Sequence, residues 1–234
     1  MPAESTPPEW HQHRDISGGW ARAAVFGVSD GLVSNVSLIL GFAGANASTA
    51  SVRLAGLAGL VAGAVSMAAG EYVSVRAQAE LLQHELDKER LALHRHPEFE
   101  IAELTKIYVD RGIEPDVAAA MARSAMANPQ LALETHAREE LGINPSSLGS
   151  PVGAAASSFV AFAIGALLPV LPWFFTSGGA AIVASVVVGS IIALAVGWAL
   201  ASFTGRSRVF SAFRQLGIAV VAAAATTLVG HFVG

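Results

Sequence analysis

The sequence contains no cysteine and few charged residues. Without cysteine, disulfide bonds and thiolate metal sites are excluded. Only 14% of the 234 residues are charged, whereas 53% are hydrophobic. A typical soluble domain carries about 25% charged residues, so this composition is typical of a polytopic membrane protein.

Motifs for nucleotide-driven or hydrolytic chemistry are also missing. No P-loop is present, which argues against ATP hydrolysis as a source of energy. Residues 27–31 match the G-x-S-x-G hydrolase pattern, but they lie inside an apolar stretch rather than at a strand-to-helix turn. His84 and Glu85 begin an H-E-x-x-H zinc motif, but Lys88 stands where the second histidine is needed. The sequence therefore predicts a protein that is not an enzyme, with no organic cofactor and no nucleic-acid partner.

Five apolar stretches are long enough to cross a bilayer as helices, which takes about 20 residues each. They cover residues 20–45, 52–75, 151–174, 179–203 and 216–233. All five are rich in Ala, Gly and Val, and spacings such as Gly59 to Gly63 allow helices to approach closely. The predicted fold class is an all-α membrane protein with five transmembrane helices and a helical metal-binding domain between the second and third.

The same pattern predicts the domain organisation and the orientation. The segments are a cytosolic N-terminus at 1–19, two spans at 20–77, an acidic helical cytosolic domain at 78–145, and three spans at 146–234. With the N-terminus inside, every one of the 14 Lys and Arg residues except Arg53 falls on the cytosolic face. The C-terminus then lies outside.

The acidic segment 78–145 has helical start and stop signals. No breaker precedes Leu93, so the second transmembrane helix is expected to continue into the cytosol. Three prolines are each placed in the first turn of a further helix, where proline is tolerated. They are Pro97, Pro115 and Pro129. We expect Gly112 to end the first of these helices and Gly142 to end the last.

Acidic residues in this segment recur at helical spacing, so that pairs share one helix face. The pairs are Glu85 with Glu89, Glu100 with Glu103, and His136 with Glu140. Carboxylates with an imidazole suit Fe²⁺, Mn²⁺ or Zn²⁺. The alternative is a solvated surface of salt-bridged helices. Its basic partners would be Lys88, Arg90, Lys106 and Arg138.

Asp30 lies inside the first apolar stretch. A carboxylate at bilayer depth is costly and persists where it faces a cavity, a partner or a cation. Asn35, Met67 and Glu71 are its candidate companions, and a path from the cytosolic mouth can run through Glu71 and Met67 to Asp30. The alternatives are a structural hydrogen bond from Asp30 to a neighbouring helix and an interfacial, snorkelling Glu71.

Three runs of residues resemble the vacuolar iron transporter family, which includes nodulin-21-like proteins. The runs are Gly-Val-Ser-Asp-Gly-Leu-Val at 27–33, Ser-Met-Ala-Ala-Gly-Glu-Tyr at 66–72 and Glu-Glu-Leu-Gly-Ile at 139–143. The resemblance extends from about Trp20 to the end of the chain and is to a bacterial-type member. It implies a homodimeric, proton-coupled exporter of Fe²⁺, and in some cases Mn²⁺, with translocation ligands at Asp30 and Met67.

The resemblance also implies a cytosolic metal cluster. The candidate ligands are Glu85, Glu89, Glu100, Glu103, His136, Glu139 and Glu140. Gly59 departs from the plant members, which carry a glutamate at that position, and His136 stands where they carry methionine. Glu71 replaces a glycine of their pattern, and we expect it to supply the missing carboxylate nearer the cytosol.

The expected mechanism is exchange of metal for protons. The acidic domain captures divalent cations, Glu71 passes them to Asp30 and Met67, and protons from the far side compete for the same carboxylates. Two alternatives are a metal-dependent membrane enzyme with a ferritin-like Glu/His centre and a membrane metal sensor, but neither of them needs Asp30. The Ala- and Gly-rich composition and compact length favour a bacterial plasma membrane.

Overall fold

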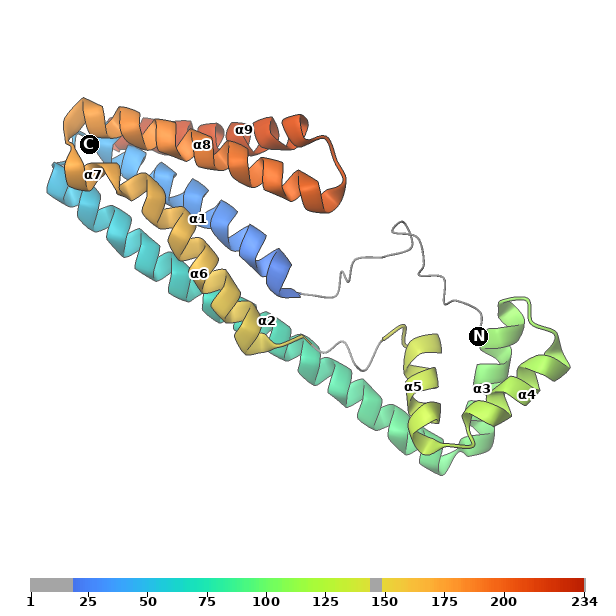
Figure 1. Cartoon of the computed structure of the whole chain (residues 1–234). Coiled ribbons are helices and arrows are strands. Elements are labelled where there is room, and N and C mark those ends of the chain that lie inside the picture. Colours follow the sequence, from blue (N-terminus) through green and yellow to red (C-terminus); the bar gives the residue numbers. More distant parts are fainter. Residues whose placement is uncertain (1–18, 144–148, 234) are drawn as a thin grey trace, which may run out of the picture. The chain divides into compact units, whose positions relative to one another are not determined.

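The structure is a computed structural model that describes residues 19–143 and 149–233 (Figure 1). Among these residues it is built from α-helices and contains no strand, as predicted. The helices are α1 (Gly19–Gly44), α2 (Thr49–Arg95), α3 (Pro97–Asp110), α4 (Pro115–Ala125), α5 (Pro129–Glu139), α6 (Pro151–Val170), α7 (Pro172–Phe175), α8 (Gly178–Thr204) and α9 (Arg208–Val233). The predicted N-terminal segment 1–19 lies almost wholly outside the described residues.

The chain divides into two compact units. We call the unit formed by α1, the first half of α2 and α6–α9 the membrane unit, and the unit formed by the rest of α2 with α3–α5 the acidic unit. The functional domains expected at 20–77, 78–145 and 146–234 remain a prediction.

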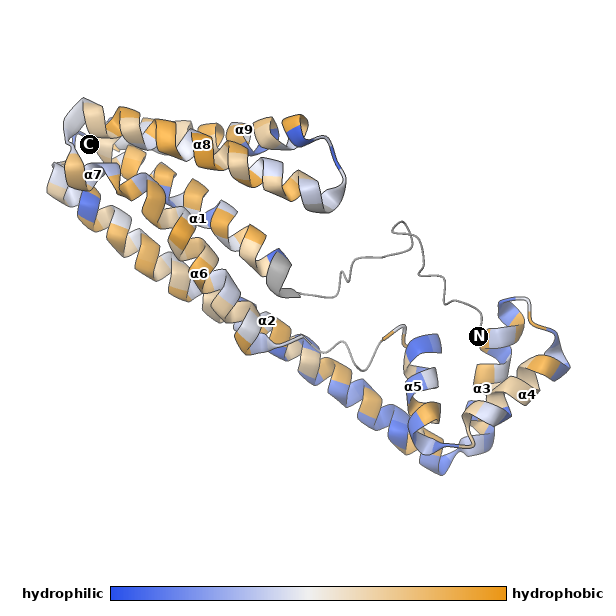
Figure 2. Cartoon of the chain, in the orientation of Figure 1, coloured by the Kyte–Doolittle hydropathy of each residue, from blue (hydrophilic) through white to orange (hydrophobic). Residues whose placement is uncertain are grey.

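Five helical segments in the described residues are long and apolar enough to cross a membrane, which confirms that the five predicted stretches are helices of spanning length. Apolar residues dominate α1, α6, α8 and α9, whereas the second half of α2 is largely hydrophilic (Figure 2). The last helix begins at Arg208 rather than at the predicted Leu216. The Ser207 hydroxyl accepts a hydrogen bond from the Phe210 N–H (3.4 Å), which starts the helix before the apolar stretch begins.

Helix α2 is a single helix of 47 residues, so the prediction that it continues without a break as far as Leu93 is confirmed. At 1.5 Å per residue it is about 70 Å long, more than twice the hydrocarbon thickness of about 30 Å. Its continuous apolar stretch ends near Val75. The residues after Gln78 therefore lie beyond the apolar part of the helix.

Backbone-to-backbone packing holds α1 against α6 in the membrane unit. A Cβ atom added to Gly31 would lie 2.2 Å from the carbonyl oxygen of Phe162, and one added to Gly165 would lie 2.3 Å from that of Val28. Neither position accepts a side chain in this arrangement. The close approach places Leu32 in the main apolar core, where it is fully buried.

Prolines begin all three short helices of the acidic unit, as predicted. The predicted stop at Gly112 follows the end of α3 at Asp110, and Gly112 has a φ of +90° that favours glycine. The predicted stop at Gly142 was three residues too late, because α5 ends at Glu139. Its last turn widens before the glycine: the Leu141 N–H donates to the His136 carbonyl, five residues back (3.4 Å).

Candidate metal centre and membrane cleft

Three helices of the acidic unit bring one imidazole and three carboxylates together. Each of these residues offers one ligand atom, and the four atoms all lie within 4.8 Å of one another. They are Glu89 from α2, Glu100 from α3, His136 from α5 and Glu140 just after α5. Donors that bind one metal ion at about 2.0–2.2 Å lie at most about 4.4 Å apart, so a small inward movement of these side chains lets them share an ion.

His136 is the centre of this metal cluster. Its Nδ1 atom lies 3.1 Å from Glu89 Oε1, 3.7 Å from Glu100 Oε2 and 3.5 Å from Glu140 Oε2. The buried face of α5 carries the imidazole inward, since Ala132 and Leu133, one turn earlier, are also buried. The packing of α5 on α2 therefore positions the histidine.

Three of the four residues of the cluster are buried, so each of their polar groups needs a hydrogen-bond partner or a bound ion. His136 is fully buried, and Glu100 and Glu89 are 5% and 7% exposed. Within the described residues, neither His136 Nε2 nor Glu89 Oε1 makes a hydrogen bond, although Oε1 lies close to Nδ1. Buried polar atoms are rarely left without a partner, so Glu89 Oε1 indicates a ligand such as a cation beside Nδ1, whereas Nε2 is not the ring nitrogen that the carboxylates approach.

The electrostatics of the cluster favour a positive ligand. Burial raises the pKa of the Glu89 carboxyl to about 7, and three neighbouring carboxylates add to this rise. Burial also raises the pKa of Glu100, although the imidazole of His136 opposes the rise. A divalent cation reverses this effect, because it stabilises the ionised carboxylates. Metal and protons therefore compete for this cluster.

The structure separates the other predicted ligands from the cluster. Glu85 forms an ion pair with Lys88 (2.9 Å), which lowers the pKa of its carboxyl. Glu139 pairs with Arg111. These two glutamates match the alternative of a solvated, salt-bridged surface.

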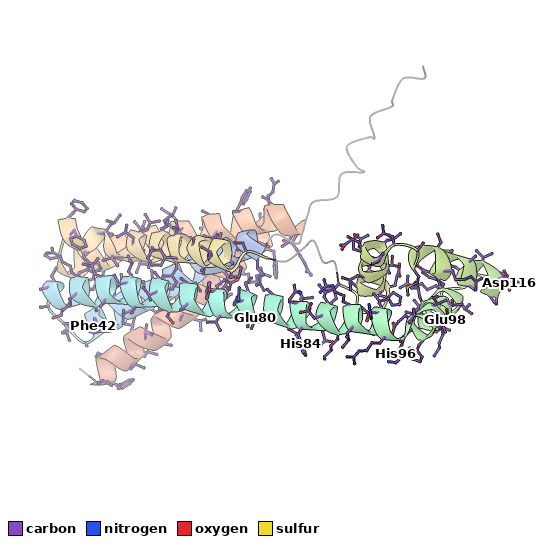
Figure 3. The ribbon with its side chains drawn as sticks, turned by 90° about the horizontal axis from the view of Figure 1, so that it is seen from below. Phe42, Glu80, His84, His96, Glu98 and Asp116 are labelled. Atoms are coloured by element: carbon purple, nitrogen blue, oxygen red, sulfur yellow. The ribbon has the colours of Figure 1, made fainter. Side chains whose placement is uncertain are left out.

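Glu103 lies near the metal cluster but is not one of its four close residues. Its charge contributes to the raised pKa values of Glu89 and Glu100, but its carboxylate is not among the four close ligand atoms. Figure 3 shows further polar side chains along the acidic unit, with Glu80 and His84 on α2 and His96 at its end. None of these three belongs to the cluster that the described residues form.

The membrane unit contains a cleft of about 380 Å³ between α1 and α2, which we call the membrane cleft. Asp30, Met67 and Glu71 all line it. On α1, Phe26, Asp30 and Ser34 are four residues apart and share the face that borders the cleft. The three residues of the path expected from the sequence are thus placed around one space.

Glycines of α2 form part of the wall of this cleft. Gly59, Gly63 and Gly70 line the cleft. A Cβ atom added to Gly63 would lie 2.2 Å from the ring of Phe162, which α6 contributes to the cleft lining. The absence of a side chain at Gly63 therefore lets Phe162 pack closely against α2 at the cleft.

The two acidic residues of the cleft, Asp30 and Glu71, have different hydrogen-bond partners. Within the described part of the chain, Asp30 has one hydrogen bond, from the Ser34 hydroxyl on its own helix (3.0 Å). The alternative of a structural bond to a neighbouring helix is therefore not observed there. Glu71 accepts from Arg22 at the start of α1, with Nη2 and Oε1 3.3 Å apart.

Asn35 has a different setting from the other predicted path residues. Its side chain is 1% exposed, and its amide donates to the carbonyls of Gly56 (3.1 Å) and Ala166 (2.6 Å). It thereby ties α1 to α2 and α6, and it is not among the residues that line the cleft. Its oxygen lies beside Gly59, where a Cβ atom would be 2.9 Å away.

Comparison with known proteins identifies the family to which the chain belongs. The profile of the VIT family matches residues 21–231. The chain belongs to the VIT family. The resemblance predicted from the sequence runs is therefore confirmed.

Relatives of this VIT chain carry names that refer to iron. It is 37% identical over 223 residues to "Vacuolar iron transporter" of Acanthamoeba castellanii, which covers 95% of the chain and 82% of that protein. It is 32% identical over 226 residues to "Vacuolar iron transporter 1" of Arabidopsis thaliana, covering 96% and 90%. It is 34% identical over 210 residues to "Vacuolar iron transporter 2" of Oryza sativa subsp. japonica, covering 89% and 85%.

Three residues at the cleft of this VIT chain were not anticipated from the sequence. Ser34 follows Asp30 by four residues, so helical spacing alone could have identified it. Arg22 precedes Asp30 by eight residues on the same helix face, so helical spacing could have identified it as well. Phe162 comes from α6, and no local sequence pattern relates it to α1 or α2.

Proposed function

We propose that this VIT-family chain is a proton-coupled exporter of Fe²⁺, Mn²⁺ or both from the cytosol. The observation that carries the proposal is the membrane cleft, where Asp30, Met67 and Glu71 surround one space. Two carboxylates with one thioether offer a divalent cation hard and soft donors together. The names of the relatives support iron as the transported ion.

The metal cluster of the acidic unit captures the ion in this proposal, with Zn²⁺ as a further ion that its Glu/His donors accept. The ion then binds in the cleft, first at Glu71 and next at Asp30 and Met67. Protons from the far side compete for the carboxylates of the cleft and release the metal. Loss of these protons to the cytosol restores the ionised carboxylates and resets the site.

The proposal includes a membrane orientation and an assembly. The N-terminus and the acidic unit face the cytosol and the C-terminus faces outward, in a bacterial plasma membrane. Large apolar side chains support a lipid-facing or subunit-facing surface on the membrane unit: Leu54 and Val221 are each 70% exposed. We propose a homodimer with α1 near its axis, following the family resemblance.

The direct test is uptake of Fe²⁺ and Mn²⁺ by vesicles that contain the full chain. Vesicles that are acidic inside are expected to accumulate metal from a neutral medium, because outward proton flow drives metal inward. Collapsing the pH gradient with a protonophore should reduce accumulation to that of protein-free vesicles. Uptake that persists without the gradient would contradict proton coupling.

The buried metal cluster favours one second candidate, a ferritin-like oxidase centre that binds Fe²⁺ and reduces O₂. Its carboxylates and histidine are donors of the kind that such iron centres use. Oxygen consumption on addition of Fe²⁺, without metal accumulation in vesicles, would support this activity. A metal sensor would show neither. The cleft favours transport over both, because neither of them needs Asp30.

Metal binding by the cluster should weaken as the pH falls through about 7. The pKa of Glu89 is raised to about 7, so below that pH the carboxyl is protonated and metal must displace the proton. One displaced proton lowers the affinity by about tenfold per pH unit below 7. Mn²⁺ titration of the detergent-solubilised Asp30→Asn variant at pH 6, 7 and 8 measures the cluster with the cleft impaired. A constant affinity over this range would contradict proton competition.

A further inference from the structure

Arg22 forms an ion pair with Glu71 at the membrane cleft. Its Nη2 atom lies 3.3 Å from Glu71 Oε1. The arginine side chain is 72% exposed, whereas the glutamate side chain is 17% exposed. The glutamate is therefore the sheltered partner, and the arginine reaches it from the surface.

The position of Arg22 puts it at one end of the cleft. Arg22, Phe26 and Asp30 are four residues apart and share one face of α1. Phe26, Asp30 and Glu71 line the cleft, and Arg22 is not among its lining residues. Arg22 thus stands outside Phe26, at the end of the cleft remote from Asp30.

A guanidinium at this place is a competitor for cations. It is permanently charged, and it already interacts with a carboxylate oxygen that a divalent cation needs. It also repels a second positive charge that approaches the same oxygen. Because the pair is exposed on the arginine side, it contributes little free energy, and the arginine can be displaced.

We propose that Arg22 is a tethered counter-ion, which holds Glu71 while the cleft is free of metal and is displaced when a divalent cation binds there. Its competition sets the metal concentration at which the cleft fills. This inference rests on the proposed transport function. Arg22 is a positioning and competing residue, since it acts on the ion through Glu71.

The test is the KM of Mn²⁺ uptake by acid-inside vesicles that contain the full chain. Arg22→Gln should lower the KM by about 1.5- to fivefold, the range expected from the loss of an exposed ion pair. The maximal rate should remain within about twofold of wild type. Arg22→Lys should retain most of the wild-type KM, because the ammonium also pairs with a carboxylate.

Two further variants separate this role from a general effect of surface charge. Arg206→Gln removes the same charge from an exposed position between α8 and α9 and should leave the KM unchanged. In a Glu71→Gln background, Arg22→Gln should have no further effect on the KM, because the group through which it acts has been removed.

An unchanged or raised KM in Arg22→Gln would overturn the inference, and so would an equal decrease in the Glu71→Gln background. Each of these outcomes leaves the proposed function standing, because wild-type vesicles still accumulate metal. Wild-type vesicles that take up no more Mn²⁺ and Fe²⁺ than protein-free vesicles would overturn the transport function and this inference together.

Discussion

Asp30→Asn should reduce acid-driven uptake of Fe²⁺ and Mn²⁺ by about 100-fold or more, to the level of protein-free vesicles. The amide keeps the size of the carboxylate and can still accept the Ser34 hydroxyl, so the local packing of α1 is retained. It carries no negative charge for a divalent cation, and it binds no proton in the physiological range. One substitution therefore removes both competitors from the same site.

The matched control for this variant is Asp116→Asn, at an exposed position in the first turn of α4. It makes the same chemical change outside the cleft and should transport at the wild-type rate. Both proteins should elute as single species in detergent and show equal helix content. Uptake by Asp30→Asn within about twofold of wild type would contradict a path through Asp30.

Much of the fold could be predicted because its signals are local. A membrane span needs about 20 consecutive apolar residues, and a proline in the first turn marks a helix start wherever it occurs. Pro97, Pro115 and Pro129 each begin a helix for this reason. The start of α9 was missed because its first turns include polar residues that an apolar window excludes.

The candidate sites depend on contacts between distant segments, and spacing alone left choices open. Glu85 and Glu89 share a face of α2, and both stand at a spacing that fits a ligand. The packing of α5 on α2 distinguishes them: Glu89 lies beside His136, whereas Glu85 pairs with Lys88. A pattern within one helix carries no information about which of its residues another helix will cover.

At the membrane cleft, too, the sequence did not show which residues of other helices a given residue contacts. Gly59 was noted in the sequence as a missing glutamate. In the structure it also borders the Asn35 amide oxygen and lines the cleft. A glycine at this position lacks a ligand and also permits close packing with Asn35, and only the three-dimensional arrangement shows the second effect.

Glu89→Gln should change the thermal stability of the protein in opposite directions with and without metal. The pKa of Glu89 is raised from its ordinary value to about 7, so the ionised form is disfavoured in the folded protein. The associated stability is present below the unfolded-state pKa of 4.5 and is lost as the pH rises through about 7. At pH 8 without metal, the neutral amide should therefore give a higher Tm than the ionised carboxylate.

With Mn²⁺ added, the order should reverse. A metal that binds the folded state at 1,000 times its Kd stabilises it by about 4.1 kcal/mol, and the variant should lose most of this gain because it lacks one charged ligand. Glu80→Gln, on the same helix but exposed and paired with Arg76, should behave like wild type in both conditions. Thermal unfolding followed by circular dichroism at pH 8, with Mn²⁺ or with EDTA, measures the six Tm values of wild type, Glu89→Gln and Glu80→Gln. If Glu89 only supported packing, its substitution would lower the Tm in both conditions. If Glu89 is a metal ligand with a raised pKa, its substitution raises the Tm in EDTA and lowers the Tm in Mn²⁺.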